Sequence, residues 1–418
     1  MERLIVSYDT RTPSAFILAE AARDLCGIIW MVDLSDPEMA HFAPLLRKLG
    51  TVVDIARLSV AQAVQDLGAT APSGIITFND SRMTVLAEIA PRLGLEFHSL
   101  GVAERLSDKL LQRQAMHAAG LPVPSFWEIP EGLDQAGTEC FARDVRFPAI
   151  LKPRRGAGSR NVLQVHDAEE LARLIALPGD RQAEPTGWML EGYLPDASPA
   201  VSRFSDIVSA ESFVQGGTVH HFAVTGRFPF AHPFRETGMV LPSDIAPADM
   251  AVVQELATEA IAALGVRHGC QHTEVKFTPE GPRVIEVNGR LGGAVPQLVT
   301  YAGGGVSVFR IAMELALGAH PTVELPLAFP KIAYRRIAPP PAWARRIATM
   351  SGHDHLKELH GVAEVTFNRL PGDPVDWHLG LGEFVYGVYG SAMSYEEVEA
   401  VCALVDRTVT VTYDEGPS

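Results

Sequence analysis

Short apolar runs alternate with longer amphipathic segments through the first hundred residues. The pattern predicts strands at 4–8, 27–32, 51–53 and 74–78, and helices at 13–25, 40–49, 61–67 and 82–93. We expect Thr12 to cap the first of these helices and Pro13 to occupy its first position. Such alternation of strand and helix is typical of a doubly wound, mostly parallel sheet. The G-x-G-x-x-G fingerprint of a dinucleotide site does not follow the first strand.

Strands lie closer together in the middle of the chain. The pattern predicts a helix at 107–119, strands at 126–128, 149–151, 161–165 and 189–191, and a helix at 168–176. Residues 207–227 are typical of an antiparallel pair that turns at a Gln-Gly-Gly sequence. Helices are expected at 247–264 and 305–317, on either side of a hairpin. Past residue 326, a proline-rich stretch and further short strands indicate a separate C-terminal module.

The hairpin carries the strongest chemical signal in the chain. Its strands, 272–278 and 283–288, are joined by a Pro-Glu-Gly-Pro turn. If the turn centres on Glu280, Glu274 lies directly opposite Glu286. Bare carboxylates in such cross-strand positions repel each other, and a cation between them would turn the repulsion into attraction.

A third oxygen ligand is available beside the two glutamates, because the same register places His272 opposite Asn288. Two carboxylates and an amide oxygen suit Mg²⁺ or Mn²⁺ shared with a phosphate chain. A surface hairpin with two solvated glutamates is the alternative. Apolar Val275, Ile285 and Val287 on the other face indicate instead that the hairpin is packed.

The residues after the hairpin can contact an anion. Arg290 offers a planar cation that binds a phosphoryl group or a carboxylate bidentately. The Gly292-Gly293 pair lets the backbone approach a ligand closely before an apolar helix begins.

A lysine and a glycine-rich loop follow the strand at 149–151. Lys152 precedes Pro-Arg-Arg-Gly-Ala-Gly-Ser-Arg, where backbone N–H groups could cradle polyphosphate oxygens while the ammonium adds charge. The loop is not a Walker A motif, because G-x-x-x-x-G-K is absent. A lysine-proline pair beside a flexible loop is also common on protein surfaces, so this segment alone does not establish a phosphate-binding site.

Several other polar residues allow two interpretations, one functional and one structural. The backbone of the apolar strand around Glu191 could bracket an adenine edge, or the strand could be an edge with one exposed glutamate. Arg227 could reach a site or lie in a solvated turn. His220 and His221 are neighbours on one strand and face opposite ways, so we interpret them as structural.

The composition limits the classes of binding partner and the cellular compartment to be expected. At 418 residues the chain is long enough for two to four domains. Lys+Arg 35 against Asp+Glu 50 gives a net charge of −15, which disfavours nucleic acid or an anionic membrane as the main partner. We find no apolar run of membrane-spanning length and no signal-peptide pattern. The scattered cysteines, without C-x-x-C spacing, predict neither a zinc site nor disulfides, which fits a reducing cytoplasm.

Taken together and in order, these motifs resemble the ATP-grasp superfamily of carboxylate–amine ligases. The resemblance runs through residues 107–109, the Lys152 strand with its loop, residues 191–194, Glu274 and residues 286–290. The combination is specific, although no single motif is. It implies an α/β chain with the α+β ATP-grasp fold. The implied parts are an N-terminal Rossmann-like domain at 1–105, a small lid subdomain at 106–195, a central catalytic subdomain at 196–325 and a C-terminal α+β module at 326–418 that closes the site.

The resemblance also implies roles for individual residues. Those that would contact ATP are Lys109, Lys152, Gly156, Gly158, Ser159, Glu191, Tyr193 and Leu194. Those that would bind magnesium or manganese are Glu274, Glu286 and Asn288. Those that would face the substrates or the acyl phosphate are Glu236, Gly238, Arg290, Gly292 and Gly293. Glu236 and Arg290 would take part in the chemistry.

One segment resembles a particular branch of the superfamily. Residues 233–243 are similar to the E-x-G-H-x-x-P-S loop of L-amino acid ligases, which places Glu236 near the amino-acid substrates. Many relatives carry histidine where this chain has Met239. Glu211 matches the glutamate of the S-V-E strand, and we assign no contact to it. No ribose-binding acid is assigned either, because 195–206 resembles an insertion.

The function implied is ATP-dependent ligation of a carboxylate, an amino acid in this branch, to an amine. The carboxylate would form an acyl phosphate with release of ADP, and the amine would then displace phosphate. We expect small-molecule carboxylate and amine substrates, no nucleic acid or membrane partner, a cytoplasmic location and a homodimer. One alternative is a biotin carboxylase-like enzyme, although the chain has no Met-Lys-Met carrier motif. The other is an ATP-binding regulatory protein without turnover, which the full set of lysines, acids and arginine disfavours.

Overall fold

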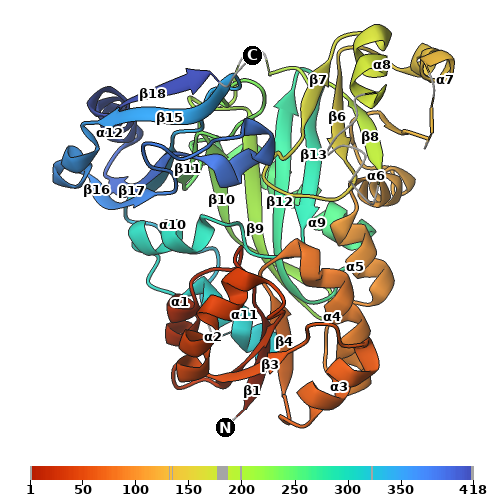
Figure 1. Cartoon of the computed structure of the whole chain (residues 1–418), viewed down its shortest axis with the longest axis vertical. Helices are drawn as coiled ribbons and strands as arrows, with labels where there is room; N and C mark the ends of the chain where they lie inside the picture. The colour runs from red at the N-terminus through yellow and green to blue at the C-terminus, as the bar shows by residue number, and fades with distance from the viewer. Residues whose placement is uncertain are drawn as a thin grey trace.

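A long antiparallel sheet runs through the centre of the protein, with smaller units at both ends (Figure 1). The computed structural model describes residues 2–130, 132–133, 135–176, 187–197, 200–321 and 323–415. These described residues form four β-sheets. The N-terminal domain lies at one end of the central sheet, and two smaller units flank its other end (Figure 1).

The N-terminal domain is a parallel sheet with helices on both faces. Its strands are β1 (Arg3–Ser7), β2 (Gly27–Val32), β3 (Thr51–Asp54) and β4 (Gly74–Thr77), in the order β3-β2-β1-β4. Helices α1 (Ala15–Ala22) and α2 (Pro37–Leu49) pack on one face, and α3 (Val60–Gly68) and α4 (Met83–Ile89) on the other. The doubly wound architecture expected from the apolar pattern is therefore confirmed.

The start of the first helix differs from the prediction. Helix α1 begins at Ala15 after Ser14, so the prediction that Thr12 caps it is wrong. The Thr12 hydroxyl instead donates to Oδ1 of Asp9 at 3.1 Å and accepts from the Asp9 backbone N–H at 3.0 Å. Thr12 closes the turn at the carboxyl end of β1, because its short side chain reaches back three residues.

A small antiparallel subdomain follows two connecting helices. The helices are α5 (Leu100–Ser107) and α6 (Lys109–Ala118). The strands are β5 (Phe126–Glu128), β6 (Ala149–Pro153), β7 (Leu163–Val165) and β8 (Trp188–Gly192), in the order β5-β8-β6-β7. Two further helices belong to this unit, α7 (Gln135–Phe141) and α8 (Ala168–Ala176).

The central sheet has eight antiparallel strands, in the order β13-β12-β9-β10-β11-β14-β17-β16. Their bounds are β9 (Ile207–Gln215), β10 (Thr218–Arg227), β11 (Gly238–Leu241), β12 (Gly269–Thr278), β13 (Gly281–Asn288), β14 (Ile332–Ile337), β16 (Val362–Phe367) and β17 (Tyr386–Ala392). The sheet continues past residue 325, where we predict a domain boundary, because β14 pairs with β11. The C-terminal module adds β15 (Ala344–Ser351), β18 (Thr410–Glu415) and α12 (Tyr395–Thr408).

Short 3-10 helices occur at several loops. They are η1 (Asp80–Arg82), η2 (Ala90–Leu93), η3 (Ala142–Asp144), η4 (His353–Glu358) and η5 (Trp377–Glu383).

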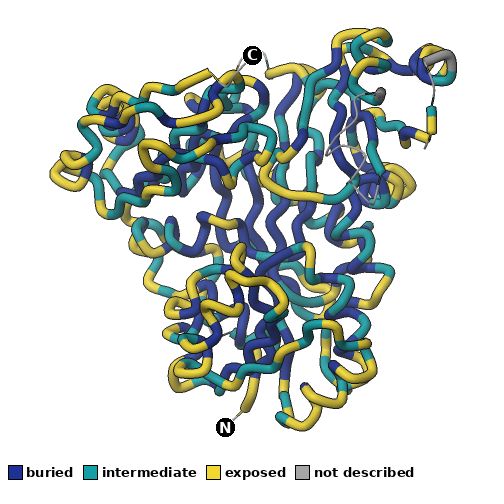
Figure 2. The backbone as a smooth tube through the Cα atoms, in the orientation of Figure 1, coloured by how far each residue is buried: buried dark blue, intermediate teal, exposed yellow. Residues whose placement is uncertain are grey.

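The two faces of the central sheet have different neighbours. On one face, Val208, Val224 and Val275 pack against α9 (Pro247–Ala263). On the other, Phe213 belongs to a core shared with α10 (Val295–Tyr301), α11 (Val308–Ala316) and the N-terminal domain. The central strands are buried along most of their length (Figure 2). Polar side chains on the second face are therefore held on a packed floor.

The remaining sequence expectations concern cysteines and membranes. Cys26, Cys140, Cys270 and Cys402 are all free thiols. Across the described part of the chain, no helix is both long and apolar enough to cross a lipid bilayer.

Gly238 provides a test of the junction between β11 and β14. Its φ is 151°, and a Cβ there would lie 2.0 Å from the Arg335 carbonyl oxygen. We expect Gly238→Ala to lower the free energy of unfolding by at least about 2 kcal/mol, measured by urea denaturation. The matched control is Gly382→Ala, where a Cβ meets no heavy atom within 4 Å. Equal stability of the two variants would contradict the close packing at this junction.

Candidate active site

A cavity of about 260 Å³ lies between the small subdomain, the central sheet and the C-terminal module. Most of the site residues predicted from the sequence line it. They are Lys109, Lys152, Gly156, Gly158, Ser159, Glu191, Tyr193, Leu194, Glu236, Glu274, Glu286, Asn288, Arg290 and Gly293. Gly238 and Gly292 do not line it. A Cβ on Gly292 would lie 2.7 Å from Nδ1 of His272, so this glycine allows close packing behind the cavity.

The register of the central sheet places the polar residues in rows across one face. Glu286 pairs with Glu274, which pairs with Ser209, which pairs with Thr225. One row further along the strands, Arg227 pairs with Met239 and Met239 with Arg335. Directly opposite residues of antiparallel strands point to the same face of a sheet. Residues far apart in the sequence therefore meet in one cavity.

The hairpin of β12 and β13 has the predicted pairing but not the predicted turn. Glu274 lies opposite Glu286 and His272 opposite Asn288, as expected. Thr278 pairs with Gly281, so the turn centres between Pro279 and Glu280 rather than on Glu280 itself. A β-bulge after Glu274 inserts one extra residue on β13 and restores the pairing of the two glutamates.

Helix α6 holds the bulged strand in place. Arg113 donates to the carbonyl of Ile285, the extra residue of the bulge. The Gln112 side chain accepts from the Val287 N–H at 3.0 Å and donates to its carbonyl at 2.9 Å. Since β13 is an edge strand, these side-chain bonds replace a neighbouring strand and fix the position of Glu286.

The side chains of Glu274, Glu286 and Asn288 suit a divalent cation whose remaining coordination positions are filled by a bound substrate. Nδ2 of Asn288 donates to the His272 carbonyl at 3.4 Å, so the amide oxygen is the atom that could coordinate a metal. Glu286 Oε1 lies 3.0 Å from the Lys109 ammonium. Among the described residues, no three His, Cys, Asp or Glu side chains form a complete metal cage. Two carboxylates and an amide suit Mg²⁺ if phosphate oxygens and water complete the shell.

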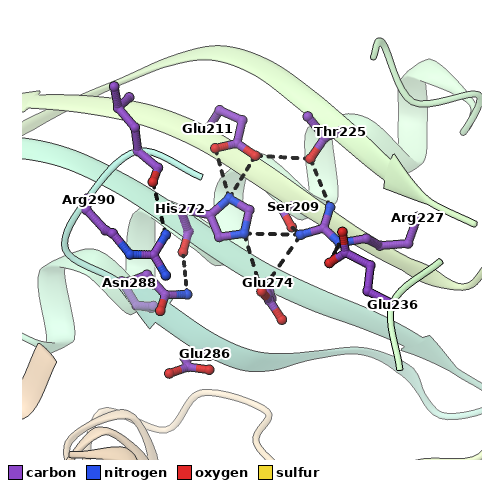
Figure 3. Close-up of polar contacts among 12 residues, drawn as sticks. Ser209, Glu211, Thr225, Arg227, Glu236, His272, Glu274, Glu286, Asn288 and Arg290 are labelled. Carbon is purple, nitrogen blue, oxygen red and sulfur yellow. Dashed lines mark hydrogen bonds and ion pairs between the residues drawn. The ribbon is translucent and has the colours of Figure 1, made fainter. Parts of the chain in front are cut away.

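A buried network connects the metal-ligand candidates to Arg227 (Figure 3). His272 Nδ1 lies 2.8 Å from Oε1 of Glu211, and its Nε2 lies 3.1 Å from the Arg227 guanidinium and 3.3 Å from Oε1 of Glu274. Burial lowers the pKa of His272, but the two carboxylates outweigh burial and raise it to about 9. Burial raises the pKa of Glu274, but His272 and Arg227 lower it to about 2. Both pKa shifts favour the ionised forms of His272 and Glu274, and Glu211 lies outside the cavity.

Arg227 does not lie in a solvated turn. Its side chain is 3% exposed, and it donates to the Ser209 hydroxyl at 3.0 Å. Its Nε lies 3.4 Å from Oε2 of Glu236, whose other oxygen, Oε1, is buried without a hydrogen-bond partner in the described structure. Glu236 thus presents a free carboxylate oxygen within the lining of the cavity.

Lys152 belongs to a buried group of three charges. Glu191 Oε2 lies 2.6 Å from the Lys152 ammonium, and Oε1 lies 2.7 Å from Nε of Arg113. Burial raises the pKa of Glu191, but Arg113 and Lys152 reverse this effect and hold it below its ordinary value. Glu191 is therefore not an exposed edge-strand residue. Its side chain orients Lys152 at the cavity wall.

Arg290 is oriented by the N-terminal domain. Its Nε donates to Oδ2 of Asp80 at 2.7 Å, and its NH1 group donates to the Leu291 carbonyl at 3.0 Å. Burial lowers the pKa of Arg290, but Asp80, Glu286 and Glu274 raise it overall. Asp80 lies in η1, directly after β4, at the carboxyl end of the parallel sheet.

The glycine-rich loop after β6 contacts the C-terminal module. The Gly158 carbonyl accepts from the Leu381 N–H at 2.8 Å, and the Ser159 carbonyl accepts from Arg235 at 2.7 Å. On the inner side, Lys109 donates to the Gly156 carbonyl at 2.5 Å. The loop thus lies between the cavity and η5.

Sequence reasoning missed several of these residues. Arg113 follows Lys109 by four positions on α6, and this spacing alone predicts a shared helix face. Asp80 carries no local signal, because its role depends on its contact with Arg290, which lies in a distant segment. The interpretation of His221 as structural is confirmed: its ring bonds Ser212 and Thr258, each at 2.8 Å.

Comparisons with known proteins agree with this geometry. The family model described as an ATP-grasp domain matches residues 145–297. The crystal structure of an L-amino acid ligase from Bacillus licheniformis superposes with a TM-score of 0.78 at 20% identity, covering 99% of each chain. This likeness confirms the fold class predicted from the sequence.

Two curated relatives are more similar in sequence. Protein y4rH of Sinorhizobium fredii is 29% identical over 311 residues, which is 72% of this chain and 60% of that protein. Human carnosine synthase 1 is 27% identical over 326 residues, which is 73% of this chain and 38% of that protein. The matched part of the chain thus spans less than two thirds of the length of either relative.

Removal of the Glu191 charge tests the buried group of three. Glu191→Gln leaves Lys152 and Arg113 without their common carboxylate, so we expect the free energy of unfolding to fall by about 3 kcal/mol or more. Urea denaturation followed by tryptophan fluorescence measures the change. Glu128→Gln is the control, because this carboxylate is 55% exposed and pairs with Arg154 at the surface. A Glu191 variant as stable as the control would show that the three charges are not interdependent.

Proposed function

From the ATP-grasp domain that this chain carries, we propose that it is an ATP-dependent ligase that joins a carboxylate to an amine. One observation supports this most strongly. Lys109 and Lys152, the oxygen-bearing side chains of Glu274, Glu286 and Asn288, and Arg290 all line a single cavity. In the first step a carboxylate oxygen attacks the γ-phosphorus and the bond to ADP breaks. In the second, the amine nitrogen attacks the acyl carbon, phosphate leaves, and the nitrogen loses its proton.

Different residues of the cavity carry out the separate parts of this reaction. Lys109 and Lys152 bind phosphate oxygens beside the glycine-rich loop. Glu274, Glu286 and Asn288 would hold a magnesium or manganese ion, which would neutralise phosphate charge. The loop at 156–160 covers the phosphates, and its contacts with η5 exclude water from the acyl phosphate.

Arg290 and Glu236 bind the groups that react. Arg290, held by Asp80, stabilises the charge on the transferred phosphoryl group and on the acyl phosphate. Oε1 of Glu236 is buried and has no hydrogen-bond partner among the described residues, so Glu236 accepts the ammonium of an amino-acid substrate. The carboxylate substrate is therefore an amino acid.

Three further expectations belong to this proposal. The nucleotide is ATP, with adenine against the backbone of residues 191–194. The four free thiols support a reducing, cytoplasmic location. We also retain the homodimer that the family resemblance suggests.

Trapping of the acyl phosphate tests the first half-reaction. The full chain, incubated with ATP, Mg²⁺, hydroxylamine and single amino acids, is expected to form a hydroxamate with at least one acid. Phosphate release should depend on that acid. Phosphate release that depends on bicarbonate alone would favour a carboxylase instead. A lack of acid-dependent phosphate release with every acid tested would contradict the ligase.

Substitution of a metal ligand tests the site. We expect Glu286→Gln to reduce turnover by at least about 10³-fold, because the ion loses one of two carboxylates and Lys109 loses its counter-ion. The matched control is Glu280→Gln in the turn of the same hairpin, where the side chain is 84% exposed. Full activity in the Glu286 variant would exclude the hairpin as the metal site.

A further inference from the structure

Arg235 is a buried arginine that joins three segments but does not itself line the cavity. It lies in the connection between β10 and β11 and is 3% exposed. Its Nε donates to the Trp377 carbonyl at 2.9 Å, and its NH1 group donates to the Ser159 carbonyl at 2.7 Å. The first carbonyl belongs to η5 and the second to the glycine-rich loop. Arg235 therefore connects the segment before β11 to both.

The guanidinium of Arg235 has no carboxylate partner at ion-pair distance among the described residues. Its NH2 group is buried without a hydrogen-bond partner there, and its guanidinium carbon lies 4.9 Å from the centre of the Trp377 ring. Burial lowers the pKa of Arg235 to about 10, and the charge of Asp376 opposes this effect only in part. Since an apolar side chain would be less costly to bury here, the guanidinium indicates a role beyond packing.

The glycine-rich loop and η5 meet in a close backbone contact beside Arg235. The Leu381 N–H donates to the Gly158 carbonyl at 2.8 Å, and a Cβ on Gly380 would lie 2.1 Å from the same carbonyl oxygen. Ser159 has a φ of 56°, a left-handed conformation that residues with a side chain rarely adopt. The position of the loop therefore depends on its partners rather than on its own backbone preference.

The two neighbours of Arg235 in the sequence do line the cavity. Phe234 and Glu236 belong to its wall, and Oε1 of Glu236 is the buried oxygen that we assign to a substrate ammonium. The segment is braced by two backbone hydrogen bonds between Arg235 and Ala231, of 2.7 and 2.8 Å. A ligand on Glu236 would therefore bind one residue away from the group that holds the loop.

We propose that Arg235 is a positioning residue that couples the amino-acid site to closure of the glycine-rich loop. This inference rests on the proposed ligase function. A substrate ammonium on Glu236 fixes the segment that carries Arg235, and Arg235 in turn holds the Ser159 carbonyl against η5. The loop then covers the phosphates most firmly when the acid to be activated is bound, and water is kept from the acyl phosphate. Because linkage is reciprocal, closure of the loop also stabilises the amino-acid site.

Hydrolysis of the acyl phosphate by the full chain measures closure of the loop. Acid-dependent phosphate release is followed with ATP and Mg²⁺, once without any amine and once with hydroxylamine, and the readout is the ratio of the first rate to the second. We expect a ratio of about 0.1 or less in the wild type and a rise of roughly fivefold or more in Arg235→Met, because water then reaches the intermediate. A variant that merely folds less well loses both rates together and keeps the ratio. Arg235→Lys keeps the charge but not the planar fork, so its ratio should lie between the two.

Gly380→Ala tests the same contact from the other side. The added methyl group would meet the Gly158 carbonyl, so we expect the ratio to rise here too. Gly382→Ala is the matched control, because a Cβ there meets no heavy atom within 4 Å. Arg369→Met is the control for the loss of an arginine, since Arg369 lies 2.6 Å from Glu383 of η5 and has no described contact with the glycine-rich loop. Both controls should keep the wild-type ratio.

Binding without turnover measures the coupling between the two sites. The Kd of the Mg²⁺ complex of AMP-PNP, an ATP analogue with a nitrogen bridge, is determined by calorimetry with and without the acid that gives the strongest hydroxamate. We expect the acid to tighten binding of the analogue by roughly fivefold or more in the wild type, and by less than about twofold in Arg235→Met.

The possible failures are distinguishable. An unchanged ratio in Arg235→Met would overturn the proposal, as would an equal rise in Arg369→Met. Equal tightening of the analogue by the acid in the wild type and in Arg235→Met would also overturn it. Absence of hydroxamate with every acid would contradict the ligase function itself, and this inference with it.

Discussion

The pairing of Glu274 with Glu286 is the constraint on which the candidate site depends. Because side chains alternate along a strand, a shift of one residue would turn Glu286 out of the cavity. The bulge at Ile285 supplies the one residue needed to keep the pair in register. Helix α6 stabilises it through Arg113 and Gln112. The metal-ligand geometry is therefore maintained by a helix that precedes the hairpin by more than a hundred residues.

The same helix positions Lys109 and Lys152, the two lysines proposed to bind phosphate. Lys109 is the first residue of α6, and Arg113, one turn later, shares Glu191 with Lys152. Movement of α6 would displace both lysines and the edge strand together. The central sheet adds the other groups, because its rows bring β10, β11 and β14 to one face. Only Asp80 reaches the site from the N-terminal domain among the contacts described above.

Local patterns were sufficient to predict much of this arrangement. Alternating strands and helices predicted the parallel sheet, and cross-strand counting predicted the glutamate pair. The counting assumed a turn centred on Glu280, and the pairing holds only because a bulge compensates for the real turn. No period in the sequence encodes a bulge. Likewise, the short strands expected past residue 326 give no sign that β14 joins β11, because strand pairing over such distances depends on tertiary packing.

The cavity is rich in charges that neutralise one another before any ligand enters. Lys109 and Glu286, 3.0 Å apart, act as mutual counter-ions in the free protein. A phosphate at Lys109 would release Glu286 for the metal, and a metal at Glu286 would release Lys109 for the phosphate. Each ligand thus removes a competitor of the other, so their affinities are thermodynamically linked. Under the proposed function, this ion pair would make the binding of nucleotide and of metal cooperative.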